Sequence, residues 1–439
     1  MLVAGEGRGS RKERYSVIRL TGPRRRIVSL PLYRSLALMA TTAFISRPVL
    51  AQEWSGDNTP DQLFLPEEGT GVQLGSNFRL FPTVQGEADY DSNIYNVDSG
   101  KRADAIFILR PEARISSDFA RHYLELRGGA EIRRYADNSG ENAEAYHIDA
   151  LSRLELGGHI DVVPEAGYAR GFERRGTAGD QFFSDEPIIF RRKYLGLQLS
   201  RTVGLLGLSA DGRVTTLDYS DATIGGVPID LSDRDVTVRV GHLRASYRLS
   251  EGISAFAEAG LNEVDYRTPV AQQRNSNGYS TLAGLRAEPS PLLSFEVAAG
   301  YLHQGFDNPA YKDVSDIDYR LSAKWTPRRT WSVRAEVRRD VDPSPRVDTP
   351  AIIRSEFLLG AQHSVGDRLL LESEAATTTE TYQGIDRTDR YFRIDASARY
   401  RVNRNVGVTA RIGYRTQGGD TAGRNYDGVY AGVGVSVVL

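Results

Sequence analysis

Apolar and polar residues alternate along most of the chain, from about Phe78 to the last residue. The final run ends on apolar residues at every second position, which are Val433, Val435, Val437 and Leu439. Because side chains of a β-strand point alternately to two faces, the pattern predicts strands with one apolar and one polar face. We expect about 18 such strands (16–18), each near the roughly 9–11 residues that a tilted strand needs to cross hydrocarbon. The predicted fold is all-β, a transmembrane up-and-down antiparallel β-barrel over residues 76–439.

The connections between these runs alternate in length, with short turns such as Asp118–Arg121 and longer polar loops such as Glu173–Pro187 and Ser220–Asp235. Short periplasmic turns and long outside loops are typical of outer-membrane barrels, and an even strand number places both termini in the periplasm. The two long loops have enough residues to fold into the lumen. Near Ile188–Arg201 and Val236–Leu249 the alternation is broken, which predicts β-bulges there.

Composition alone would suggest a soluble protein, with 40% hydrophobic residues and 26% charged residues. The average composition does not reveal barrel strands, because every second residue of such a strand faces the lumen and is polar. From residue 52 onward no stretch approaches the roughly 18 apolar residues of a membrane helix. The lack of cysteine suits passage through an oxidising periplasm without disulfides. A net charge of −2 argues against nucleic acid as a partner.

The first residues have the organisation of an export signal. A basic region that ends at Arg34 precedes the apolar run Ser35–Ile45, and Val49–Ala51 supplies the small residues that a signal peptidase reads. We predict a signal peptide with a long basic n-region over 1–51, followed by a periplasmic N-terminal lead-in over 52–75. The alternative is a disordered basic tail in front of a cytosolic protein.

Aromatic residues occur near the ends of the predicted strands. Trp325 and Trp331 flank one short turn on the apolar face, and several tyrosines lie near the loop ends. Amphipathic rings settle at the headgroup level of a membrane, so we expect Trp325 and Trp331 to be interface aromatics. The alternative is the general β-propensity of aromatic residues.

Several segments resemble the outer-membrane β-barrel porin family of Alphaproteobacteria. They are Gly71–Gly75, Phe78–Pro82, Tyr90–Tyr95, Leu109–Glu112, Gly129–Tyr135 and Tyr382–Asp389. The resemblance covers nearly all of residues 71–439. It implies a barrel of a kind often associated with exopolysaccharide gene clusters, and it brings no catalytic or ligand residues. Barrels of this kind commonly end in Phe, whereas this chain ends in Leu439.

Basic residues are frequent at the inward positions of the strands after residue 318, where acidic residues are fewer. The pore-lining candidates are Arg320, Lys324, Arg334, Arg338, Arg393, Arg399, Arg401, Arg411 and Arg415. A wall of one sign in a low-dielectric tube biases permeation, so this wall is expected to favour anionic sugars or small anions. The alternative is that inward faces merely need polar residues, with alternating signs to avoid repulsion.

The sequence offers little for catalysis. None of the six histidines forms a closely spaced metal cluster with a second His or Cys. His363 and Ser364 are adjacent, so their side chains point to opposite faces of a strand, which is wrong for a nucleophile and its base. We therefore expect no enzyme activity, no catalytic residues, no metal and no cofactor.

These observations predict a Gram-negative outer-membrane barrel that forms a hydrophilic conduit, either porin-like or supporting exopolysaccharide export. The expected partners are the lipid bilayer of the outer membrane, the barrel-assembly machinery and anionic polysaccharide. The alternative is a non-conducting structural or surface-binding barrel whose extracellular loops engage polysaccharide or cells.

Overall fold

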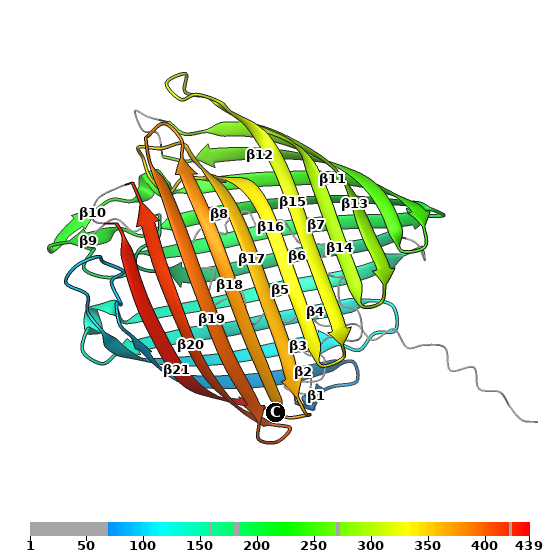
Figure 1. The fold of residues 1–439 in the computed structure, drawn as a ribbon, viewed down its shortest axis with the longest axis horizontal. Coiled ribbons are helices and arrows are strands. Elements are labelled where there is room, and N and C mark those ends of the chain that lie inside the picture. The colour runs from blue at the N-terminus through cyan, green and yellow to red at the C-terminus, as the bar shows by residue number, and fades with distance from the viewer. Residues whose placement is uncertain (1–68, 158–159, 179–183, 269–272, 421–423) are drawn as a thin grey trace, which may run out of the picture.

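The computed structural model describes residues 69–157, 160–178, 184–268, 273–420 and 424–439. One antiparallel sheet of nineteen strands dominates it, and all but the short β1 form a closed wall (Figure 1). The predicted signal peptide and most of the predicted lead-in lie outside the described residues. Among those residues, no helix is both long enough and apolar enough to cross a membrane.

The wall strands are thirteen to fifteen residues long and follow one another around the barrel. They are β2 (Phe78–Asp91), β3 (Asp104–Ser117), β4 (Tyr123–Tyr135), β5 (Ala143–Leu156), β6 (Ile160–Phe172), β7 (Ile189–Val203), β8 (Leu206–Tyr219), β11 (Val236–Ser250), β12 (Ile253–Tyr266), β13 (Ser276–Ser290), β14 (Leu293–Phe306), β15 (Val314–Arg328), β16 (Trp331–Pro343), β17 (Ala351–Val365), β18 (Leu369–Tyr382), β19 (Thr388–Arg401), β20 (Val406–Gly419) and β21 (Tyr426–Val438). The small elements are β1 (Val72–Leu74), β9 (Ala222–Ile224), β10 (Val227–Ile229) and the 3₁₀ turns η4 (Ser139–Glu141) and η5 (Ser232–Arg234).

The barrel closes between its first and last long strands. β2 pairs with β21 from Thr83↔Val438 to Asp91↔Tyr430. The final residue also takes part, because the Gly71 amide donates to the Leu439 carbonyl over 3.0 Å. The predicted closed antiparallel barrel and its eighteen strands are therefore confirmed.

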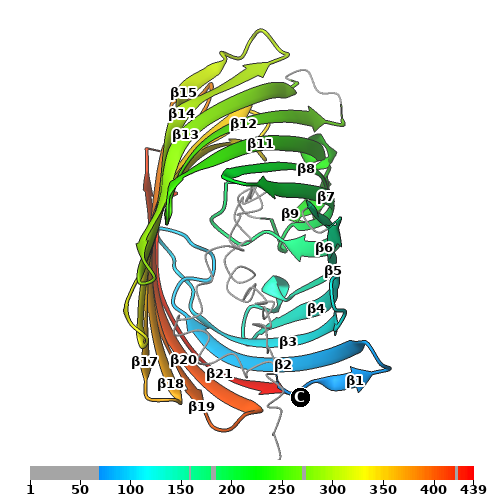
Figure 2. The same ribbon diagram turned by 90° about the vertical axis from the view of Figure 1, so that its right-hand side faces the viewer.

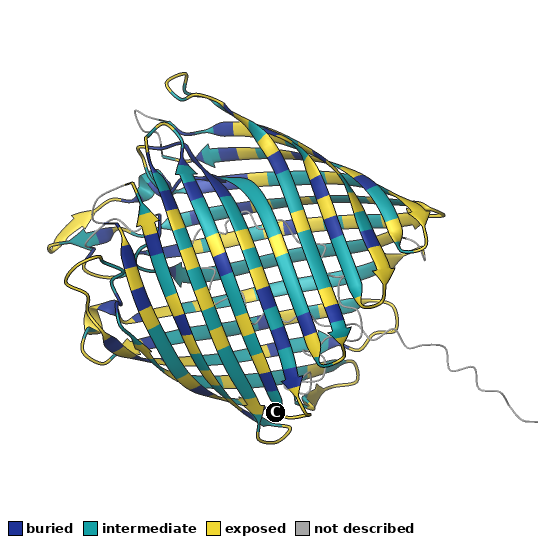
Figure 3. Cartoon of the chain, in the orientation of Figure 1, coloured by how far each residue is buried: buried dark blue, intermediate teal, exposed yellow. Residues whose placement is uncertain are grey.

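Exposure alternates along the strands as the sequence pattern predicts (Figure 3). Leu195, Leu243 and Leu261 are 65%, 64% and 70% exposed, while the residues beside them face inward and are more buried. In a soluble protein such exposed leucines would cost free energy, whereas on the outside of a membrane barrel they contact lipid.

Long and short connections lie at opposite ends of the barrel (Figure 1). The tightest turns use glycine with positive φ, as at Gly204 between β7 and β8 (φ 61°). Glycine adopts this left-handed conformation without the Cβ clash that other residues meet. The long connections form the loop end, and the described residues before β2 (69–77) and after β21 (Leu439) lie at the short-turn end.

The bulge expected in β7 was wrong, and in β11 an irregularity occurs only at the end of the strand. The register of β7 is continuous with both neighbours, and that of β11 shifts only at its end, between Arg248 and Ser250. The alternation is broken for another reason. At the loop end, inward positions such as Phe190, Val236 and Val238 are apolar because they pack together in a buried cluster.

Candidate functional site

The inner face of the wall carries ladders of opposite charges. Arg110 is bonded to Glu87 at 2.8 Å and to Glu131 at 2.7 Å, so one guanidinium joins β2, β3 and β4. On the other side of the barrel, Arg244 and Arg320 both contact Glu258. Charged groups of this kind are stable where water or an opposite charge solvates them, which fits a polar lumen.

The nine predicted pore-lining residues lie on β15, β16, β19 and β20, and most have an acidic partner. The ion pairs are Arg320 with Glu258, Arg334 with Glu374, Arg338 with Glu356, Arg393 with Glu374 and Asp395, Arg399 with Glu372, Arg411 with Glu87 and Asp89, and Arg415 with Asp91. Lys324 lies opposite Arg334 in the ladder, and Arg401 donates to the carbonyl of Asp367 in a short turn.

These pairs bring acids from neighbouring strands against the basic residues that follow residue 318. Glu258, Glu87 and Asp89 lie on strands before residue 318. Counting only the acidic residues of the later strands therefore omits carboxylates that pair with these basic side chains. Locally the arginine charges are largely compensated. Whether the nine residues line an open pore remains a prediction.

The two predicted interface tryptophans flank the turn between β15 and β16 and point outward. Trp325 and Trp331 are 51% and 39% exposed. The Trp331 ring stacks on His363 of β17, with centroids 4.1 Å apart and planes at 20°. His363 also contacts the Thr330 carbonyl through Nδ1 at 3.0 Å. The Ser364 hydroxyl donates to the Gly366 carbonyl, so these two side chains have different hydrogen-bond partners.

At the loop end, the connection between β6 and β7 reaches across the barrel. Ala178 packs with Ile352 of β17 and Tyr382 of β18 in one buried cluster. Round the eighteen-strand wall, β17 lies nine strands from β6 in either direction, which is the opposite side. The start of this loop, residues 173–178, therefore spans the outer mouth, as its length had suggested.

Hydrogen bonds hold residues 173–178 in this position across the mouth. The Arg175 guanidinium bonds to Glu141 at 2.6 Å and to the Ser184 hydroxyl at 2.7 Å. The Asn96 side chain donates to the Arg175 carbonyl at 2.6 Å, and Arg424 donates to the Thr177 carbonyl at 3.1 Å. Four separate parts of the chain thus hold one short segment.

The tip of the β16–β17 hairpin fills another part of the mouth. β15 and β16 pair only up to Arg320↔Arg338, while β16 and β17 stay paired as far as Pro343↔Ala351. Beyond the last β15–β16 pair, β16 separates from β15 and stays with β17, which remains paired with β18 as far as Ile352↔Tyr382. Its Ser344 carbonyl accepts hydrogen bonds from the Tyr266 hydroxyl (2.7 Å) and from Arg274 (3.1 Å), and Ser344 and Arg274 are almost completely buried.

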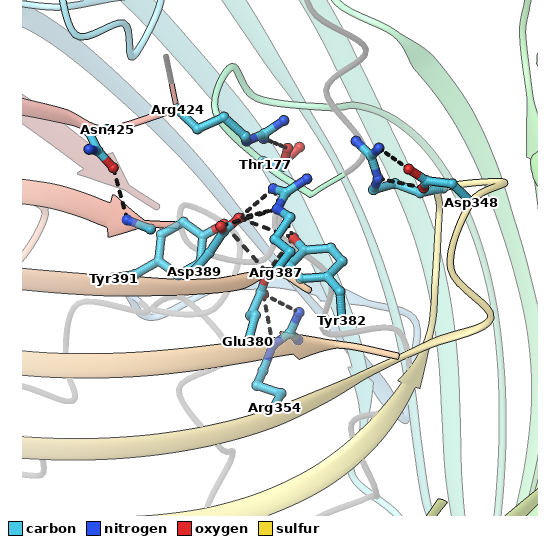
Figure 4. Close-up of polar contacts among 12 residues, drawn as sticks. Thr177, Asp348, Arg354, Glu380, Tyr382, Arg387, Asp389, Tyr391, Arg424 and Asn425 are labelled. Carbon is cyan, nitrogen blue, oxygen red and sulfur yellow. Dashed lines mark hydrogen bonds and ion pairs between the residues drawn. The ribbon is translucent and has the colours of Figure 1, made fainter. Parts of the chain in front are cut away.

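Below this tip lies a buried charged cluster (Figure 4). Arg354 bonds to Asp342 and to Glu380, each at 2.7 Å. Glu380 also accepts from the Tyr382 hydroxyl at 3.1 Å. Nearby, Arg387 pairs with Asp389. Burial alone would lower the pKa of the Arg387 guanidinium, but its hydrogen bond to Asp389 and its electrostatic interactions with Tyr382, Asp389 and Tyr391 together outweigh burial and raise that pKa above its ordinary value.

The mouth residues could not be found from the sequence pattern. Arg234 and Arg274 lie in or beside loops, and their partners are distant in the chain: Arg234 pairs with Glu173, and Arg274 donates to Ser344. Loop charges are ordinarily solvent-exposed, so composition gives no sign of their burial. The breaks in alternation at β7 and β11 were the one usable signal, since inward apolar residues require something to pack against them.

No group of three or more His, Asp or Glu side chains is placed to hold a metal ion within the described residues. His147 and Asp149, which share a face of β5, are 3.8 Å apart. Asp149 accepts a hydrogen bond from the Tyr194 hydroxyl at 2.8 Å, so it belongs to the polar inner wall.

A family model described as Putative beta-barrel porin 2 matches residues 66–439. This match covers the whole described barrel. No curated protein matches the sequence.

Solved structures similar to this chain include three outer-membrane proteins. The siderophore receptor PirA from Pseudomonas aeruginosa is 9% identical, with 84% of this chain and 81% of that chain covered and a TM-score of 0.42. The FrpB iron transporter from Neisseria meningitidis is 10% identical, with 87% and 84% covered and a TM-score of 0.44. OccK9 (OpdG) from P. aeruginosa is 12% identical, with 82% and 98% covered and a TM-score of 0.44. The activities in these names are properties of those proteins.

Proposed function

The chain belongs to the Putative beta-barrel porin 2 family, and from that premise we propose that it forms a hydrophilic conduit through the outer membrane, porin-like or supporting exopolysaccharide export. The family and the closed barrel imply an outer-membrane location. The single observation that carries the conduit is the ion-paired inner wall, illustrated by Arg110 between Glu87 and Glu131. An eighteen-strand barrel is wide enough to leave a lumen, whereas eight strands are filled by their own side chains.

The same geometry gives the conduit a narrow outer opening. Loop residues 173–178 and the β16–β17 tip occupy the mouth, so passage on the proposed route is restricted to slender hydrophilic molecules, such as single saccharide chains or small solutes. The partners of the proposal are the outer-membrane bilayer, the barrel-assembly machinery and anionic polysaccharide. It includes no catalysis, cofactor or nucleic acid.

The test is single-channel recording of the purified protein in a planar bilayer, with neutral and anionic oligosaccharides added as blockers. We expect small stable openings that anionic oligosaccharides block. The Ala178→Glu variant should give larger openings, because a carboxylate cannot occupy the buried site between Ile352 and Tyr382. Val227→Gln, at a 59% exposed position of β10, is the control and should match the wild-type protein.

The packed mouth also favours a second candidate, a non-conducting barrel whose loops bind polysaccharide or cells at the surface. The recordings separate the two. Silence from folded wild-type protein together with silence from Ala178→Glu would reject the conduit and favour the surface-binding barrel. Openings that appear only in Ala178→Glu would show a lumen that the mouth closes.

A further inference from the structure

A cluster of cations lies on the outside of the barrel, on strands that stand side by side in Figure 2. In the ladder, Tyr146 of β5 is directly opposite Arg170 of β6, which is directly opposite Arg191 of β7. These positions share a face with the exposed residues Ile148 and Leu195, two and four residues along the same strands. The side chains of this row therefore point away from the lumen.

Two arginines face one another in this row. Directly opposite side chains on neighbouring strands have Cβ atoms roughly 5 Å apart, and like charges at that distance destabilise a sheet. Lys193 adds a third cation on the same face, two residues after Arg191. Such an arrangement needs an anion to offset its repulsion.

The nearby carboxylates do not supply enough negative charge. On the outer face of β4–β8 at the loop end, Arg134, Arg170, Arg191 and Lys193 face two acids, Glu144 and Asp218. Glu144 pairs with Arg134. Asp218 is shared between Lys193, at 3.3 Å, and Arg267. Asp218 lies directly opposite Arg191 in the ladder, but among the described residues the ion pairs of its carboxylate are to Lys193 and Arg267.

The position of the cluster along the strands indicates what supplies the anion. One ladder row nearer the membrane centre, Tyr168 lies between Ile148 and Lys193, and the next row includes Leu195. The rings of Tyr146 and Tyr168 lie 6.1 Å apart, in the same two ladder rows as the three cations and next to this apolar surface. Tyrosine pairs of this kind settle at the headgroup level, and Arg and Lys extend from there toward the polar side.

We propose that Arg170, Arg191 and Lys193 bind the phosphate of a phosphorylated outer-leaflet lipid, whose acyl chains lie on the apolar surface around Leu195. The loop end faces outward in an outer-membrane barrel, so these cations meet the outer leaflet. The planar guanidinium fork matches the geometry of a phosphate, and two forks with one ammonium surround it with charge-assisted donors. This site is on the lipid side of the wall and does not depend on conduction through the lumen.

The opposite part of the rim offers a matched control. Arg390 of β19 also points outward at the loop end and is exposed, but its ladder neighbours are Thr379 and Gly418. Arg390 is the third residue of β19, as Arg191 is of β7, so it offers a single cation at the loop end without the clustered charge. Loss of Arg390 should therefore leave lipid binding unchanged.

The experiment uses the whole protein, purified and freed of lipid in a neutral detergent. Diphosphoryl lipid A, the same lipid after dephosphorylation, and inorganic phosphate are titrated separately, and dissociation constants are measured by native mass spectrometry. We expect diphosphoryl lipid A to bind wild-type and Arg390→Gln protein equally. Arg191→Gln should bind it at least about tenfold more weakly, since it loses a charge-assisted hydrogen bond. Arg191→Lys, which keeps the charge without the fork, should fall between them.

Three results would overturn the proposal. Equal affinity of wild-type and Arg191→Gln protein would remove the cluster from the site. Equal binding of dephosphorylated lipid would mean that the acyl chains alone are recognised. Inorganic phosphate that binds as tightly as the lipid would indicate a free-anion site. If Arg191→Gln does not fold, as judged by its heat-modifiable gel mobility, Lys193→Gln and Arg191→Lys provide the same comparison.

Discussion

Replacing Arg354 with methionine should loosen the outer mouth and leave the wall intact. Arg354 bonds to Asp342 and Glu380, and all three side chains are buried. Removing the cation leaves two buried carboxylates facing each other, and breaking a buried ion pair in this way costs about 3–5 kcal/mol. Each 1.4 kcal/mol is about tenfold in an equilibrium constant, so opening of the cluster should become about 100-fold to several thousand-fold more frequent.

Hydrogen exchange of the native protein measures this directly. Amides at the loop ends of β17 and β18 should exchange faster in Arg354→Met by that factor, while amides near the short turns should not change. The control is Arg239→Gln, which removes an ion pair to Glu263 whose side chains are 46% and 49% exposed. Exposed pairs contribute about 0–1 kcal/mol, so exchange there should change less than about fivefold. If Arg354→Met exchanges no faster than Arg239→Gln, the buried cluster does not hold the mouth.

Three further outcomes are expected. Gly300→Ala should destabilise the barrel by about 1–3 kcal/mol in urea titrations, because a Cβ there would lie 1.7 Å from the Thr281 carbonyl oxygen, whereas Gly418→Ala meets nothing within 4 Å and should be neutral. Joint neutralisation of Arg393, Arg399 and Arg411 should shift reversal potentials toward cation preference, since their acidic partners remain; unchanged potentials would mean that these side chains do not face the permeation path. Hydrogen bonds from the Gly226 and Gly225 amides hold the pKa of the Asp185 carboxyl below its ordinary value. The contact between Asp185 and the β9–β10 turn should therefore persist at all pH values above that ordinary pKa and be lost only as pH falls through the lowered pKa. Asp185→Asn should remove this acid dependence, as measured by hydrogen exchange.

The wall of the barrel was predictable because it depends on a local rule. A side chain's face follows from its position in the strand, so the runs around Leu195 and Leu261 could be assigned to the lipid side without knowing their neighbours. The strands extend farther at the loop end than the alternation of hydrophobicity does. β16 continues to Pro343 and β18 to Tyr382, because polar residues at the loop end stay paired above the membrane.

The mouth was not predictable because its contacts join segments that only the closed barrel brings together. Ala178 meets Ile352 because the loop after β6 crosses the mouth toward β17, which lies on the opposite side of the eighteen-strand circle. Nothing in the composition of either segment marks the other as its partner. The two long loops had enough residues to enter the lumen, but length alone could not show that the β16–β17 tip enters as well.

Register, more than strand number, decides which charges this barrel presents to water and which to lipid. Arg170 and Arg191 form a cationic pair only because β6 and β7 pair with Arg170 opposite Arg191. If β7 slipped by one residue, Arg170 would lie opposite a residue that now faces inward, and the exposed Leu195 side chain would point toward the lumen. The apolar band and the ladder of inner charges therefore fix the register together, since each penalises a slip on its own face. Because the register is fixed in this way, the outer cations lie at the headgroup level, where a lipid phosphate is the available anion.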